Sequence, residues 1–120
     1  MRFLLMVPLV LTLVGCAAPG LYQWGGYDQA LYAAYKDPTK MAELQLKLET
    51  HIAAMEAAKL KVAPGLYAEL GTLYLQGGAA EKATNLYARE RAAWPESKGL
   101  MTTMIQNIER RQQAKKEAQK

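Results

Sequence analysis

Residues that favour β-strands and residues with reactive side chains are scarce in this chain of 120 residues. It has four valines and three isoleucines, and three of the valines lie before residue 15. It has one cysteine (Cys16), one histidine (His51) and one serine (Ser97). β-Branched residues dominate strands, and thiol, imidazole and hydroxyl groups build metal sites, Cys/His pairs and serine triads. The composition therefore excludes a mainly β or doubly wound fold, and we expect no catalytic site, metal or cofactor.

Alanine and leucine are abundant instead, with 20 and 17 copies. Both favour helices because they lose little side-chain entropy there. The hydrophobic share of 51% and the charged share of 22% are ordinary for a globular protein. We therefore predict an all-α fold in one small domain.

The first residues have the proportions of a secretory signal. Arg2 precedes an apolar run of 12 residues, Phe3 to Val14, which is too short for the ~20 residues of a membrane span. The run ends in Leu-Val-Gly-Cys, which resembles the bacterial lipobox. That resemblance implies that residues 1–15 are cleaved as a lipoprotein signal peptide and that Cys16 carries a lipid anchor. Alanine follows Cys16, where inner-membrane lipoproteins usually carry Asp, so we expect an outer-membrane location facing the periplasm.

Removal of the signal changes how the charge of the chain is read. The formal net charge is +4 for the whole sequence, and residues 109–120 hold five basic and two acidic groups. Loss of Arg2 with the signal leaves +3, which these groups account for, so the rest of the mature chain is neutral. Nucleic acid is not an expected partner because of the predicted periplasmic location. The basic end is either a solvated helix end or a contact for anionic lipid, cell-wall polymer or an acidic partner.

Glycine and proline pairs divide the mature chain into segments of helical length. The first predicted helix runs from Tyr27 to Lys36. Asp37 and Pro38 then predict the N-cap and first residue of a long amphipathic helix that ends near Leu60. The apolar stripes are Tyr27, Ala30, Leu31, Ala34 and Tyr35 in the first helix, and Met41, Leu44, Leu48, Ile52 and Met55 in the second. His51 lies beside the second stripe, which favours a partly buried packing residue over a ligand.

Residues 64–97 resemble one tetratricopeptide repeat, a helix-turn-helix unit of about 34 residues. The matching positions are Tyr67, Leu70, Gly71, Tyr74, Gly78, Ala83, Tyr87 and Pro95. In such a unit, small residues at Gly71 and Ala83 let two antiparallel helices approach closely. One position departs from the pattern, since Glu90 stands where a small residue is expected. A single unit cannot bury its own apolar faces, so neighbouring helices must complete the core.

After Pro95, Ser97 is a reasonable N-cap for a last helix. Its predicted stripe is Leu100, Met101, Met104, Ile105 and Ile108. The prediction is a tetratricopeptide-like stack of about five helices. Its parts are the signal peptide (1–15), the lipidated cysteine with an aromatic and glycine linker (16–26), the helical domain (27–114) and a basic tail (115–120).

The mature chain also resembles an uncharacterised family of small bacterial lipoproteins, a domain of unknown function. Two elements carry this resemblance: Trp-Gly-Gly-Tyr at residues 24–27 and Trp-Pro at 94–95. The resemblance implies neighbouring lipoproteins as partners, among them one similar to the curli secretion channel. It assigns no activity.

Two surfaces are candidates for partner contact. Tyr22, Trp24 and Tyr27 crowd around the glycines near the anchor, where Trp24 is either a structural cap over the helical stack or part of an aromatic contact surface. The second candidate is the usual concave face of the repeat, with Ala68, Thr72, Leu75 and Gln76. This face lacks the Lys and Asn of carboxylate-binding repeats, so an apolar or helical partner segment suits it better.

The acidic residues do not suggest catalysis. Glu43, Glu49, Glu56 and Glu81 occupy helical surface positions near lysines, which indicates solvated faces. We therefore expect a non-catalytic scaffold or adaptor in an envelope complex of the secretion type. Two alternatives stay open, a pilotin-like helper for a secretin or pilus component and a cell-wall-associated accessory protein.

Overall fold

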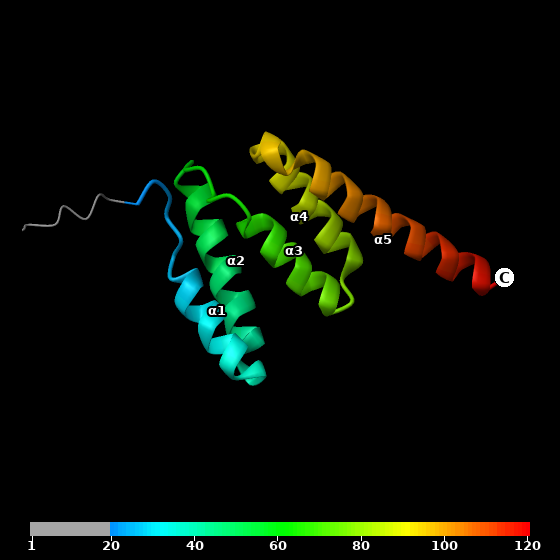
Figure 1. Ribbon diagram of the computed structural model, residues 1–120, viewed down its shortest axis with the longest axis horizontal. Coiled ribbons are helices and arrows are strands. Elements are labelled where there is room, and N and C mark those ends of the chain that lie inside the picture. Colours follow the sequence, from blue (N-terminus) through cyan, green and yellow to red (C-terminus); the bar gives the residue numbers. More distant parts are fainter. Residues whose placement is uncertain (1–19) are drawn as a thin grey trace, which may run out of the picture.

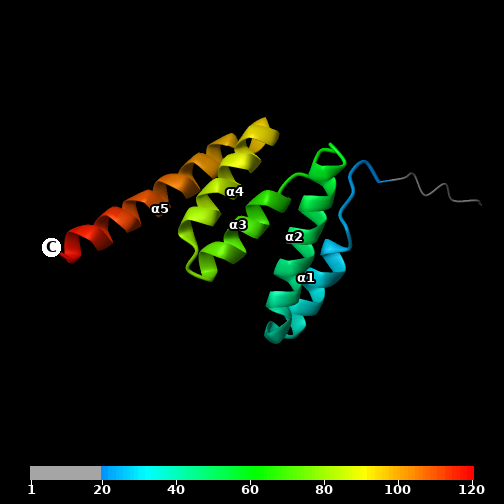
Figure 2. The ribbon, with the colours of Figure 1, turned by 180° about the vertical axis from the view of Figure 1, so that it is seen from behind.

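The computed structural model describes residues 20–120, which form five α-helices and two short 3-10 helices. In chain order these are α1 (Tyr27–Lys36), η1 (Pro38–Lys40), α2 (Met41–Ala57), α3 (Leu66–Gln76), α4 (Ala80–Ala93), η2 (Pro95–Ser97) and α5 (Lys98–Ala118). Helices α1 and α2 form one hairpin and α3 and α4 a second, while α5 lies along α4 and extends past it (Figures 1 and 2). The predicted all-α class is confirmed.

Local signals place α1 where the sequence predicts it, whereas α2 is shorter than predicted at both ends and stops at Ala57 rather than Leu60. Helix α1 has the predicted bounds and follows Gly26, whose φ of 73° is left-handed and suits glycine. The Asp37 carboxylate accepts the backbone N–H of Thr39 at 3.1 Å, as an N-cap does. This cap opens a 3-10 turn rather than α2 itself, which begins three residues later than Pro38.

The C-terminal helix begins after Ser97, as predicted, but it lacks the predicted side-chain cap and includes part of the predicted basic tail. Ser97 stands at the N-cap position of α5 but makes no capping hydrogen bond, because its Oγ donates to Glu90 Oε1 at 3.2 Å instead. Helix α5 then continues to Ala118, beyond the predicted domain end at 114. Lys115 and Lys116 of the predicted tail therefore belong to the last helical turn, where cations interact favourably with the helix dipole.

Two clusters of buried apolar residues form the core. The larger joins α1, α2 and α3 with Leu86 of α4, and the smaller joins α4 and α5, with half-buried residues of α3 packed against it. Their buried members are Ala34, Leu44, Leu48, Ile52, Met55, Val62, Ala63, Leu66, Tyr67, Leu70, Leu73 and Leu86 in the first, and Ala83, Tyr87, Met101, Ile105 and Ile108 in the second. Helices α3 and α4 both contribute to the two clusters, so this hairpin holds the two halves of the fold together.

Some residues of the predicted apolar stripes are exposed. Leu31 and Tyr35 lie on the outer face of α1, and Tyr35 is 84% exposed. Met41 and Leu100 are also exposed. Helix α1 packs mainly on α2 and the following 3-10 turn, so half of its stripe has no neighbour to pack against. The stripe predicted for α5 is correct for Met101, Ile105 and Ile108, which face α4.

Candidate functional site

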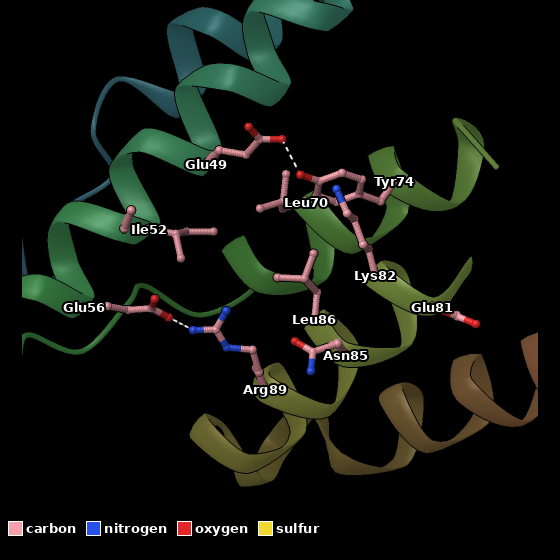
Figure 3. Close-up of a pocket in the computed structure, with 11 residues that line it drawn as sticks. Glu49, Ile52, Glu56, Leu70, Tyr74, Glu81, Lys82, Asn85, Leu86 and Arg89 are labelled. Atoms are coloured by element: carbon pink, nitrogen blue, oxygen red, sulfur yellow. Dashed lines mark hydrogen bonds and ion pairs between the residues drawn. The ribbon is translucent and has the colours of Figure 1, made fainter. Parts of the chain in front are cut away.

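A groove of about 450 Å³ lies between α2 and the α3–α4 hairpin (Figure 3). Its floor is apolar and its rim is charged or polar. The lining residues are Glu49, Ile52, Ala53 and Glu56 from α2, Leu70 and Tyr74 from α3, and Glu81, Lys82, Asn85, Leu86 and Arg89 from α4. Ile52, Leu70 and Leu86 are buried members of the core, so the floor is the outer surface of the packed interior.

One polar bridge crosses the groove between α2 and α3. The Tyr74 hydroxyl donates to Glu49 Oε1 at 2.6 Å, and Gln45 Nε2 donates to the same oxygen at 2.8 Å. The Lys82 ammonium lies 4.7 Å from the centre of the Tyr74 ring, within the range of a cation–π contact. The tyrosine is therefore held at its hydroxyl by α2 and at its ring face by α4.

A second bridge repeats this arrangement. The Tyr67 hydroxyl donates to Glu56 Oε1 at 2.7 Å, and the Arg89 guanidinium lies 4.7 Å from the Tyr67 ring centre. Arg89 also forms an ion pair with Glu56. Figure 3 shows both bridges reaching from α2, through Glu49 to Tyr74 and through Glu56 to Arg89.

The two bridges match because each partner recurs after seven residues. Glu49 and Glu56 are seven apart on α2, Tyr67 and Tyr74 on α3, and Lys82 and Arg89 on α4. Seven residues make about two helical turns, or about 10.5 Å, so each pair lies on one face of its helix. Because successive helices are antiparallel, the later glutamate meets the earlier tyrosine. We call this arrangement the Glu-Tyr-cation ladder.

The bridges also set the ionisation of their members. The hydrogen bond from Tyr74 and that from Gln45 lower the pKa of Glu49 below its ordinary value of 4.5. The same bond raises the pKa of Tyr74 above 10.0, and burial raises the pKa of Tyr67. Since folding lowers the Glu49 pKa, its contribution to stability is present above pH 4.5 and is lost as the pH falls through the lowered value.

Replacing Tyr74 with phenylalanine is expected to raise the pKa of Glu49. The variant removes the strongest hydrogen bond to the carboxylate but keeps the ring under Lys82, and Gln45 still donates, so the return toward 4.5 is partial. A carboxyl-carbon NMR titration of Glu49 measures it. Tyr32→Phe, on the exposed face of α1, is the control and should leave the Glu49 titration unchanged. An unaltered pKa in Tyr74→Phe would contradict the bridge.

The sequence predicts Glu49 and Glu56 as solvated residues. Glu56 is exposed and Glu49 is half-buried, and the prediction missed the hydrogen bonds that both accept from tyrosines. Their positions on the flank of the α2 stripe bring their carboxylates against the tyrosines of α3. The recurring seven-residue spacing in three consecutive helices is the signal that could have revealed the ladder. Glu43 and Glu81 are exposed, as predicted.

The face predicted as the concave surface of the repeat carries internal contacts. Ala68 and Leu75 are half-buried and pack against the cluster that α4 and α5 share. The Thr72 hydroxyl lies 2.9 Å from that of Tyr87 and donates to the Ala68 carbonyl. Gln76 is exposed at the end of α3. Helices α4 and α5 therefore take up most of this face, and the open concavity lies on the opposite side of α3.

The predicted aromatic element is brought together in part. Tyr22 is half-buried and stands edge-on to the rings of both Trp24 and Trp94, at 6.3 and 5.4 Å between centres. Trp24 remains 41% exposed, and Tyr27 packs against the larger core cluster. The buried indole is Trp94, at 6% exposure, whose Nε1 donates to the Val62 carbonyl at 3.2 Å. Cys16 lies outside the described residues.

His51 is half-buried, as predicted. Its Nε2 lies 2.9 Å from the Gln23 carbonyl, and its ring packs against Gly25 so closely that a Cβ there would come within 2.4 Å of Nδ1. Gly25 also has a φ of 58°. Histidine and glycine together fix the N-terminal arm, residues 20–26, against α2.

Glu90, the departure from the repeat pattern, is fully buried. Its Oε1 accepts hydrogen bonds from the backbone N–H of Gly65 at 2.8 Å and from Ser97, whereas Oε2 has no partner within the described chain. The side chain therefore joins the loop before α3 to the turn after α4. Buried carboxylates of this kind are expensive to desolvate and are tolerated where they satisfy backbone groups.

Residues 20–120 contain no group of three or more metal-ligating side chains close enough to hold an ion. None of the helices in that same range combines the length and the apolar character of a membrane span.

Comparisons with known proteins support a family assignment. No curated protein and no solved structure matches the chain. A family model matches residues 21–104, which include the N-terminal arm, both hairpins, the groove and the first turns of α5. The chain therefore belongs to the family described as Domain of unknown function (DUF4810).

Proposed function

We propose that this chain is a lipid-anchored, non-catalytic adaptor of the bacterial envelope, whose groove binds a segment of a protein partner. The observation that carries the proposal is the groove between α2 and α4, with an apolar floor and a charged rim. Concave surfaces of this kind accept helical or extended segments, with the floor supplying affinity and the rim supplying register.

The repeat resemblance supports the same proposal. Helices α3 and α4 pack as an antiparallel pair at Gly71, where the Tyr87 ring comes close to the helix backbone. Tetratricopeptide-like units commonly serve as binding modules, and the partner here binds on the side of α3 that α5 leaves open. The lipid on Cys16 would hold the adaptor at the outer membrane, facing the periplasm.

The groove can be tested by filling it. Ala53→Arg places a large side chain on an exposed position of the groove wall, so the fold should tolerate it. We expect affinity recovery of partners from detergent extracts to fall several-fold against wild type. Ala42→Arg, also exposed on α2 but outside the groove, is the matched control and should recover partners normally. Equal recovery by both variants would contradict the groove.

The identity of what is recovered distinguishes the classes of function. A lipoprotein similar to the curli secretion channel supports the adaptor. A secretin would instead favour a pilotin-like helper, and retention on peptidoglycan without protein partners would favour a cell-wall accessory.

The anchor is tested by Cys16→Ser. A hydroxyl cannot form the thioether to the lipid, so the variant should lose labelling by a fatty-acid probe in cells and should remain an uncleaved or soluble precursor. Equal labelling of wild type and Cys16→Ser would contradict the anchor.

A further inference from the structure

We propose that the end of the molecule formed by the N-terminal arm and the α2–α3 loop is a membrane-contact surface that binds an anionic lipid bilayer. This inference rests on the proposed lipid anchor at Cys16. We call the surface the arm-loop patch and define it by Leu21, Trp24, Lys59, Leu60 and Lys61.

The apolar members of the patch are exposed although they are large. Leu21 is 84% exposed, Leu60 is 48% exposed and Trp24 is 41% exposed. The arm and the loop meet at a hollow of about 240 Å³, lined by Leu21, Tyr22, Gln23, Met55, Leu60 and Lys61. Trp24 stands edge-on to Tyr22, one of these lining residues, at 6.3 Å between ring centres. Leucine and tryptophan are residue types that enter the boundary between headgroups and acyl chains.

The two charged members of the patch are both lysines. Lys59 and Lys61 flank Leu60 in the loop, and both are exposed. The Lys61 ammonium also lies 3.7 Å from the centre of the buried Trp94 ring, which holds it at this end. Each lysine near an anionic bilayer strengthens association by about fivefold. A leucine between two lysines therefore matches an apolar interior beneath an anionic surface.

The loop has a defined shape rather than a variable one. The N–H of Leu60 donates to the Met55 carbonyl at 2.9 Å and that of Lys59 to the Glu56 carbonyl at 3.0 Å, the two bonds of a Schellman motif. Lys59 occupies the left-handed position with a φ of 56°, where glycine is usual. The chain thus accepts backbone strain at the position where a lysine is presented.

The position of Cys16 in the sequence makes the bilayer the occupant of this surface. Cys16 lies four residues before Gly20, and four extended residues span at most about 14 Å. Figures 1 and 2 show that the arm leaves the fold beside the α2–α3 loop, whereas α5 ends on the opposite side of the molecule. A lipid on Cys16 would therefore hold the patch against the membrane and leave the basic end of α5 directed away from it.

Fluorescence of a tethered protein tests the proposal. Cys16 is the chain's one cysteine, so a chain beginning at Cys16, which keeps every described residue, couples at one site to a maleimide lipid. The vesicles contain phosphatidylethanolamine and phosphatidylglycerol brominated on the acyl chains. We expect strong quenching of Trp24, and Trp24→Phe measures what the buried Trp94 contributes.

The variants and controls follow from the structure. Leu21→Ser/Leu60→Ser and Lys59→Gln/Lys61→Gln should each reduce the quenching several-fold, and phosphatidylcholine vesicles should reduce it as the lysine variant does. Leu100→Ser and Lys115→Gln/Lys116→Gln change an exposed leucine and two lysines on α5, and should quench as wild type.

Two outcomes would overturn the patch: unquenched Trp24 in the tethered wild type, or full quenching in the Leu21→Ser/Leu60→Ser variant. The coupling chemistry supplies the anchor in this experiment. A failure to label Cys16 in cells would therefore remove the proposed anchor without affecting the measurement, and the two failures are distinguishable.

Discussion

Replacing Trp94 with alanine is expected to lower the free energy of unfolding by about 3 to 5 kcal/mol, a sizeable part of a small domain's stability. The indole is 6% exposed, its N–H donates to the Val62 carbonyl, and its ring contacts Tyr22 and the Lys61 ammonium. The variant loses the burial of the ring and leaves the carbonyl without its donor. Chemical denaturation of the chain from Cys16 onward measures the change.

Trp24→Ala is the matched control for this prediction. The two tryptophans meet the same Tyr22 ring, but Trp24 is 41% exposed and no hydrogen bond from its indole is found in residues 20–120. We therefore expect a clearly smaller loss than for Trp94→Ala. The 41% exposure of Trp24 favours the contact-surface alternative over the structural cap. Equal losses for both variants would contradict the assignment.

Gly71→Leu is expected to destabilise the chain by about 1 to 3 kcal/mol or more, the usual range for overpacking a tight contact. A Cβ at Gly71 would lie 2.9 Å from Cε1 of Tyr87 and 3.3 Å from the backbone oxygen of Ala83. Tyr87 is fully buried and its hydroxyl contacts Thr72, so the ring has no free space to enter. The α3–α4 pair would have to separate. A thermal melt should show a lower Tm.

Gly99→Leu provides the control for Gly71→Leu. Gly99 is also helical, in the first turn of α5, but nothing lies within 4 Å of a Cβ built there. Leucine favours a helix over glycine by up to about 1 kcal/mol, so this variant should keep or raise the Tm. A melt that ranked the two variants in the opposite order would contradict the close contact between α3 and α4.

The ladder shows how much of the candidate site was accessible from the sequence. The seven-residue spacing of Glu49 and Glu56, and its recurrence in the tyrosines of α3, is visible in the printed chain. Spacing alone places such pairs on one face of a helix without saying which helix that face meets. The Glu49–Tyr74 bond joins residues 25 positions apart, so it depends on how the two hairpins cross.

The sequence by itself determined the helical class of this protein and the bounds of α1. Breakers such as Pro38 and the glycines act within one or two turns of the chain, and their effect on φ, ψ and the N–H groups does not depend on distant residues. The bounds of α1 follow from such local rules.

Only the tertiary structure decided which faces are covered. It buries Trp94 rather than Trp24, encloses the Glu90 carboxylate, places α4 and α5 against the predicted concave face, and opens the groove on the other side of α3. These outcomes depend on which helix lies against which face. An amphipathic stripe indicates that one face of a helix is buried against another element. The crossing of the hairpins determines which element that is and which residues stay in solvent.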